Sequence, residues 1–464
     1  MGISIVQKSE FSKKKRNPRI ALVLAGGAVS GGAFKVGGLK AFNDFLVNRK
    51  VTDFDIYVGL SAGAFLAAPL AGGVSPEEML KSLDGTSKTF SQLRPVDFYY
   101  PNLREWITRP LRMWFQMATF LPGVFYDFLR AVPSLPGSVS SAARIYARDP
   151  SYTNFEAVSK EILKLLSPTR RAPSLFQALP SGIFDNAALE RYLRANMRSS
   201  GNSNDFEELY KQRKKELYIA AMNLDTAERV IFGHNEVNNV TISEAVQAST
   251  ALPGFYKPAR IKGVEYVDGG VRHTANIDIA IDHGADLIIC YNPFRPFHNR
   301  LDIEERESNK HVDYVVTKGD YLSSRGMRSV LNQVFRTLLH SRLQIGLRKY
   351  VDDVKFKGDI ILIEPQEQDL RFFELNPLAF WDRASAAERG FESVKTSIEK
   401  KYPQVRAILA SYGIETTRIY VEEDMRQMKR SAKRPERVMQ ILEREMPKVP
   451  IKVLRGSRKS SRAD

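Results

Sequence analysis

A serine between two closely spaced glycines is the first feature of this sequence that could do chemistry. Residues 59–63 read Gly-Leu-Ser-Ala-Gly, so that Ser61 is flanked by Gly59 and Gly63. A G-x-S-x-G sequence presents a nucleophilic serine when a strand turns sharply into a helix, because the turn exposes the hydroxyl and small neighbours relieve crowding. The start of the following helix also favours developing negative charge. We therefore predict that Ser61 is a nucleophile, with an ordinary structural turn as the alternative.

A serine nucleophile needs a proton acceptor, and an aspartate is the best candidate. Asp268 follows an apolar strand sequence and precedes Gly269 and Gly270, which let the backbone pass close to the carboxylate. None of the six histidines lies in a context typical of a Ser-His-Asp triad. His273 is the alternative base, although a histidine in a surface loop is the simpler interpretation, and we expect His283 to cap a helix.

A glycine-rich sequence near the N-terminus is suited to stabilising an oxyanion. Residues 24–32 read L-A-G-G-A-V-S-G-G, between a predicted strand and a predicted helix. Acyl transfer needs preorganised backbone N–H groups where the oxyanion forms, and glycines can present them at close range. The spacing of Gly26, Gly27 and Gly31 does not fit a dinucleotide-binding motif, and the Gly-Lys-Ser/Thr of a phosphate-binding P-loop is absent.

Alternating apolar strands and helices must position these residues. The strands are predicted at 20–25, 54–58, 217–224, 264–267, 286–291 and 359–364, and the helices from Gly31 onward and at 62–71, 243–250, 275–283, 384–401, 404–411 and 420–446. Buried strands that alternate with helices indicate a parallel sheet covered on both faces. We therefore expect an α/β fold.

The order of the motifs resembles that of the patatin-like phospholipase family. The glycine loop, the G-x-S-x-G sequence about 30 residues later, the A-S-T-A-L-P-G-F sequence at 248–255 and the D-G-G sequence at 268–270 follow one another as in that family. The resemblance covers residues 20–72 and 217–292. It implies a three-layer α/β/α patatin-like fold with a mostly parallel central sheet.

The resemblance also implies an activity, namely cleavage of lipid carboxylic esters through an acyl-serine intermediate, without metal or cofactor. Ser61 would be the nucleophile and Asp268 the proton acceptor of a Ser-Asp dyad, and the oxyanion hole would lie at Gly26, Gly27 and Ala28. A phospholipid or acylglycerol would be the substrate.

The glycine loop departs from the family pattern, which usually reads G-G-G-x-R/K-G. Here Ala25 replaces the first glycine, the loop is one residue longer, and the basic residue is missing. A catalytically weak or inactive membrane-associated scaffold of the same fold is therefore one alternative, and a lipid acyltransferase is another.

The chain divides into four predicted segments. Residues 1–19 form a basic leader, and residues 20–292 form the catalytic domain, with an insertion at about 75–215. Residues 293–415 complete that domain with a strand and helices, and residues 416–464 form a charged helix and a basic tail that is flexible over 447–464.

Composition and charge exclude several classes of protein. The 464 residues are 43% hydrophobic and 26% charged, as in globular proteins, and a single cysteine, Cys290, excludes a disulfide framework or a cysteine-rich metal site. Of the net charge of +16, residues 1–19 contribute +5 and residues 424–464 contribute +8. Because no aromatic residues are interleaved with these charges, we expect an anionic membrane surface rather than a specific nucleic acid as the partner.

An uncharged stretch in the insertion could also contact lipid. Residues 113–126 contain five aromatic residues and no charge. They could dip into a bilayer interface or form a lid packed on the core, and the sequence favours neither. No apolar segment is long enough to span a membrane, and the apolar stretch at 20–25 is too short for a signal peptide. We expect a cytoplasmic protein that associates peripherally with membranes.

Overall fold

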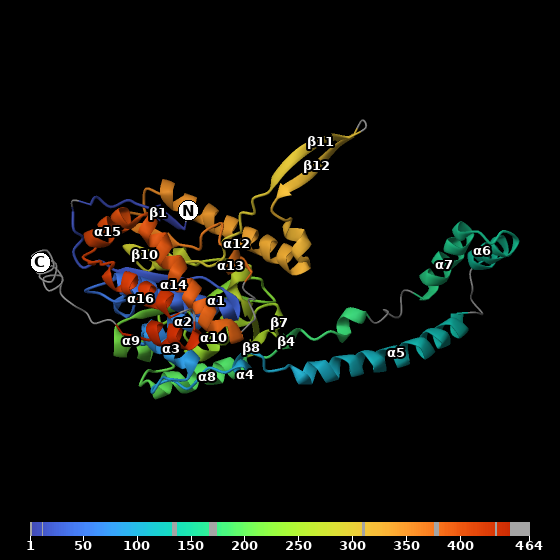
Figure 1. Cartoon of the computed structure of the whole chain (residues 1–464). Helices are drawn as coiled ribbons and strands as arrows, with labels where there is room; N and C mark the ends of the chain where they lie inside the picture. The colour runs from blue at the N-terminus through green and yellow to red at the C-terminus, as the bar shows by residue number, and fades with distance from the viewer. Residues whose placement is uncertain are drawn as a thin grey trace, which may run out of the picture. The chain divides into compact units, whose positions relative to one another are not determined.

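The computed structural model describes residues 2–11, 13–131, 137–166, 174–308, 311–374, 380–431 and 434–445 (Figure 1). Its contacts divide the chain into two units. The main unit comprises Met1–Tyr100 and Asp185–Asp464, and the second unit comprises Pro101–Phe184. The four segments predicted from the sequence stay a prediction.

A nine-stranded sheet forms the centre of the main unit. Its order is β1 (Ile3–Val6), β13 (Asp359–Ile363), β10 (Leu287–Tyr291), β2 (Ile20–Leu24), β3 (Ile56–Leu60), β5 (Glu216–Asn223), β9 (Val264–Asp268) and β8 (Ala259–Ile261), with β6 (Arg229–Phe232) also paired with β5. The strands from β13 to β5 are parallel to one another, whereas β1, β6, β8 and β9 pair antiparallel. The mostly parallel sheet predicted from the sequence is therefore confirmed.

Helices cover both faces of the sheet, as alternation along the strands requires. On β2, Leu22 and Leu24 belong to one core and Ala21 and Val23 to the other. The first core includes residues of α1 (Ala28–Phe45), α2 (Ala62–Ala71), α10 (Ile242–Thr250) and α14 (Arg383–Lys400). The second includes residues of α11 (Ile277–Asp282) and α12 (Met327–Asp352). Two covered faces make this the predicted α/β/α fold.

Further elements complete the main unit. They are α3 (Pro76–Asp84), α4 (Pro95–Phe98), α8 (Ala187–Ser199), α9 (Phe206–Arg213), α13 (Leu370–Phe373), α15 (Tyr402–Ser411), α16 (Ile419–Arg430), α17 (Pro435–Leu442), the strand β7 (Gly254–Tyr256) and the hairpin of β11 (Asp302–Ser308) and β12 (His311–Lys318).

The single helix predicted over 420–446 is wrong, since α16 and α17 are separate. Ser431 caps the C-terminal end of α16, and Pro435 begins α17 at a first-turn position, where its missing N–H is tolerated. The predicted flexible end at 447–464 lies outside the described residues.

The second unit contains α5 (Leu103–Ala131), α6 (Gly137–Arg148), α7 (Tyr152–Leu166) and β4 (Gly182–Phe184). The uncharged stretch 113–126 lies within α5, where the side chains of Trp114 and Phe115 are 63% and 61% exposed. Among the helices in the described part of the chain, none combines the length and apolar character that crossing a bilayer requires.

Candidate active site

Ser61 occupies the turn between β3 and α2. The strand ends at Leu60 and the helix begins at Ala62, so that Ser61 is the only residue between them. Its φ of 54° and ψ of −129° lie in a region that non-glycine residues rarely adopt. Holding such a conformation costs about 1–3 kcal/mol and persists only when the surrounding structure enforces it. The turn places Ser61 at the carboxyl end of a central parallel strand.

The two glycines that flank Ser61 let α2 pack against the sheet. A Cβ atom added at Gly63 would lie 2.1 Å from the Leu24 carbonyl oxygen, and one added at Gly59 would lie 2.4 Å from the Cα of Ala64. Both distances are far below a van der Waals contact, and the obstructing atoms belong to the backbone. The strained turn therefore depends on glycine at both positions.

Asp268 lies on the other side of β5 from Ser61, at nearly the same level of the sheet. Ala220 of β5 pairs with Leu60, and the next residue, Ala221, pairs with Asp268. Asp268 Oδ1 accepts a hydrogen bond of 2.8 Å from the Gly270 N–H. The antiparallel strand β9 thus ends where β3 ends, and the register brings together two residues that are far apart in the sequence.

The environment of Asp268 alters its proton affinity. Burial penalises the charged carboxylate and raises the pKa of Asp268 to about 6, against the opposing effects of a side-chain hydrogen bond with Ser61, the Gly270 N–H and the charge of Lys35. The interaction with the Ser61 side chain is the one that a proton acceptor needs. A carboxylate whose pKa is close to neutral is well matched to general base catalysis.

Ser249 supports the turn, and we gave it no role from the sequence. Its Oγ accepts a hydrogen bond of 2.8 Å from the Ser61 N–H and donates one of 2.7 Å to the Ala220 carbonyl. Ser249 is on α10 and is completely buried. The signal that could have identified it is the A-S-T-A-L-P-G-F sequence at 248–255, which we used only as a family motif.

The glycine loop lies directly against the nucleophile. A Cβ atom at Gly26 would be 3.3 Å from the Ser61 Cβ and 3.1 Å from a ring carbon of Phe294. Helix α1 begins at Ala28 with Gly27 as its N-cap, three residues before the predicted start at Gly31. The prediction was wrong because a helix's first turn needs no apolar side chain, so hydrophobic spacing does not detect it. The unpaired N–H groups of that first turn therefore begin at the loop.

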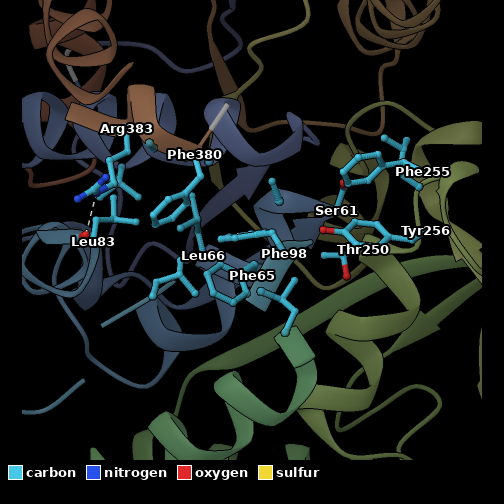
Figure 2. A pocket seen from close by; sticks show the side chains of 17 residues that line it. Ser61, Phe65, Leu66, Leu83, Phe98, Thr250, Phe255, Tyr256, Phe380 and Arg383 are labelled. Atoms are coloured by element: carbon cyan, nitrogen blue, oxygen red, sulfur yellow. Dashed lines mark hydrogen bonds between the residues drawn. The ribbon is translucent and has the colours of Figure 1, made fainter. Parts of the chain in front are cut away.

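An apolar cavity leads away from Ser61 (Figure 2). It is partly open to solvent and is lined by Gly32, Ala33, Val36, Ser61, Ala62, Phe65, Leu66, Leu83, Leu93, Phe98, Leu189, Thr250, Leu252, Phe255, Tyr256, Phe380 and Arg383. Figure 2 shows Ser61 and Phe255 toward one end and Leu83 with Arg383 toward the other. Within the described residues, the buried Tyr256 hydroxyl has no hydrogen-bond partner, so a bound ligand could use it.

The two histidines considered from the sequence lie elsewhere. His273 lines a different cavity, together with Arg272 and Arg342. His283 caps the C-terminal end of α11 as expected, and its ring nitrogens bond the Tyr218 hydroxyl at 3.0 Å and a Glu236 carboxylate oxygen at 3.1 Å. No group of three potential metal-ligating side chains is found among the residues that the structure describes.

Parts of this chain are similar in sequence to known proteins. The family model described as patatin-like phospholipase matches residues 22–281, more than half of the chain. A probable lipid hydrolase, 463L, from Invertebrate iridescent virus 6 is 27% identical over 104 residues, which are 22% of this chain and 36% of that protein. The match thus spans about a third of the viral protein.

Solved structures with detectable similarity include two bacterial proteins. VipD from Legionella pneumophila is 16% identical, with a TM-score of 0.34 and coverage of 86% of this chain and 70% of that chain. ExoU from Pseudomonas aeruginosa, solved in complex with SpcU, is 15% identical, with a TM-score of 0.25 and coverage of 90% and 65%. These scores are too low to bear on function. The family match over residues 22–281 is decisive, and the chain belongs to the patatin-like phospholipase family.

Proposed function

We propose that this chain hydrolyses the carboxylic esters of a phospholipid or acylglycerol through an acyl-serine intermediate, with Ser61 and Asp268 as a catalytic dyad. The observation that carries this proposal is the strand register that places Ser61, in its strained turn, across β5 from the buried Asp268 carboxyl, with Ser61 lining an apolar cavity. A hydroxyl paired with a base beside a hydrophobic channel suits an ester with a fatty acyl chain.

The first half of the reaction acylates the serine. Asp268 takes the proton of the Ser61 hydroxyl while Oγ attacks the carbonyl carbon of the ester. We expect the N–H groups of Gly26, Gly27 and Ala28 to stabilise the resulting oxyanion, whereas the Ser61 N–H bonds Ser249. When the tetrahedral intermediate collapses, the C–O bond to the alcohol breaks and protonated Asp268 returns the proton to the leaving oxygen.

The second half of the reaction hydrolyses the acyl-serine and restores free Ser61. Asp268 takes a proton from a water molecule that attacks the acyl-serine, and the second tetrahedral intermediate expels Ser61, which regains the proton. The fatty acid leaves through the cavity. Replacement of water by an alcohol in this step would give an acyltransferase, which remains an outcome of the experiment below.

The proposed substrate is held in a bilayer, so we also propose peripheral association with anionic membranes. The basic residues of 1–19 and 424–464 would attract an anionic surface. The exposed Trp114 and Phe115 of α5 would enter the interface.

The experiment that tests the proposal measures fatty acid released from a panel of phospholipid and acylglycerol vesicles. We expect release by the wild-type protein and a loss of at least about 100-fold in Ser61→Ala and Asp268→Asn, with His273→Ala close to wild type. Transfer of the acyl group to an added alcohol in preference to water would identify an acyltransferase. Absence of any turnover in the folded wild type would favour the scaffold.

A further inference from the structure

A buried lysine, Lys35, contacts the glycine loop, and the proposed mechanism does not use it. Lys35 on α1 is completely buried, and its ammonium donates a hydrogen bond to the Ala25 carbonyl. Burying an ammonium is costly unless a carboxylate pairs with it. Lys40 on the same helix has such a partner, Asp44, at 2.6 Å, whereas among the described residues Lys35 forms no salt bridge.

The position of Lys35 links it to the loop and to the dyad. A Cβ atom at Gly27 would lie 2.9 Å from Lys35 Cε and 3.3 Å from Nζ, so the end of the side chain is packed against that residue. The Ala25 oxygen that accepts its hydrogen bond also lies 2.6 Å from a Cβ atom added at Gly63. The ammonium is therefore held where the glycine loop meets the start of α2.

Two ionisable groups act on the ammonium, namely Asp268 on β9 and Cys290 on β10. Burial raises the pKa of the Cys290 thiol, so that group is neutral near pH 7. Glu364, which acts on Cys290, accepts a hydrogen bond of 2.8 Å from Asn292. Of these two groups, Asp268 is thus the one whose negative charge favours the protonated ammonium.

We propose that Lys35 is a positioning residue of the Ser61–Asp268 site, whose buried ammonium fixes the loop 25–27 and supplies the positive charge that this loop itself lacks. The inference rests on the proposed ester hydrolysis and adds a requirement for protonated Lys35. A fixed cation in a water-poor site stabilises both the Asp268 carboxylate and an oxyanion at Gly26 and Gly27, because charges interact strongly at low dielectric.

The pKa values of Lys35 and Asp268 predict that the protein is active only over a narrow pH range. Burial lowers the pKa of Lys35 to about 7, against the raising effect of Asp268, while burial raises the pKa of Asp268 to about 6. The active form needs ionised Asp268 and protonated Lys35. Turnover should therefore rise as the pH passes about 6, where Asp268 ionises, and fall as the pH passes about 7, where Lys35 loses its proton. Both limbs of this pH profile belong to the coupled pair.

The test compares three variants with the wild type, using a soluble short-chain ester and its kcat between pH 4 and pH 10. Lys35→Met should lower kcat by about 100-fold and move the acid limb to higher pH. Lys35→Arg should keep the acid limb and lose the alkaline limb, because guanidinium stays protonated. The matched control is Lys50→Met, which removes another buried ammonium that donates to backbone carbonyls, those of Asn43 and Leu46 at 3.1 and 2.8 Å.

Lys50→Met should keep the wild-type kcat and both limbs of its pH dependence. A folded Lys35→Met with kcat within about twofold of wild type and an unmoved acid limb would overturn the inference. If Lys35→Met does not fold, the inference is overturned instead when the kcat of Lys35→Arg still falls at alkaline pH as in the wild type. A wild type that neither turns over esters nor reacts at Ser61 would overturn the proposed function as well, so the two failures are distinguishable.

Discussion

The backbone N–H of Ser61 donates a hydrogen bond of 2.8 Å to the Oγ of Ser249. The same Oγ donates to the Ala220 carbonyl at 2.7 Å, so one hydroxyl group ties the strained turn to the central strand β5. The Ser61 N–H is engaged in this way, and under the proposed function the oxyanion donors come from the glycine loop.

Replacement of Ser249 by alanine should therefore loosen the turn. We expect Ser249→Ala to lose about 1–3 kcal/mol of unfolding free energy, because a buried N–H and a buried carbonyl lose their partner, and to lower kcat as Ser61 leaves its position. Ser397→Ala is the control, since Ser397 is also buried and donates to the Glu364 carbonyl at 3.2 Å. Urea denaturation and kcat measure the two effects. Equal kcat in both variants would contradict the role given to Ser249.

The conformation of Ser61 predicts an unusual order of stability. Glycine adopts a positive φ without steric cost, whereas alanine does not. Ser61→Gly should therefore be more stable than Ser61→Ala by about 1 kcal/mol, although both lack the nucleophile. At Ser393, inside helix α14, the order should be reversed, because glycine is the weaker helix former. Denaturant unfolding of the four variants checks this, and an alanine variant that is the more stable at position 61 would argue against strain.

The raised pKa of Asp268 predicts how stability depends on pH. Its folded-state value of about 6 exceeds the ordinary 3.8, so the folded state binds the proton more tightly than the unfolded state. The contribution of this group is then fully present below the unfolded value and lost as pH rises through about 6. We expect Asp268→Asn to gain stability relative to wild type between pH 4 and pH 7.5, by up to about 3 kcal/mol. Thermal unfolding at both pH values measures this difference, and a gain that shrinks as pH rises would be inconsistent with a buried, proton-accepting carboxylate.

Much of the fold could be predicted because its strands are short apolar runs next to glycine-rich turns. The predicted segment 286–291 contains β10, and the predicted segment 359–364 contains β13. The alternation of buried strands with helices was enough to indicate a parallel sheet. The antiparallel direction of β9 was not predicted, since a strand's direction depends on which neighbour it pairs with and its own residues do not reveal it.

The site was predictable only in part, for a similar reason. Ser61 lies in a G-x-S-x-G motif and Asp268 in a D-G-G motif, and each comes at the end of a predicted strand. These local patterns were enough to select both residues as candidates. Ser249 and Lys35 act through contacts that the fold creates, one across β5 and one beneath the glycine loop. An isolated serine or lysine in a helix carries no local signal of such a contact.

The exposed aromatic residues of α5 predict how the protein engages lipid. Replacing the exposed Trp114 and Phe115 together with the half-buried Phe120 by serine should weaken binding to anionic and to neutral vesicles and slow hydrolysis of bilayer substrate, while soluble esters are turned over as before. Removal of residues 447–464 is the comparison, since it should weaken binding to anionic vesicles only and flatten its salt dependence. Vesicle sedimentation and the two assays separate these effects. A triple variant that loses soluble-ester activity as well would show that the stretch is part of the folded core.

The most direct measurement of the central claim is the mass of the protein after reaction with a fluorophosphonate probe, which modifies activated serines. We predict that one probe molecule is added, that peptide mapping places it on Ser61, and that Asp268→Asn slows the addition by at least about 100-fold at pH 7. Folded protein that gains no mass, or modification of a serine other than Ser61, would contradict the account.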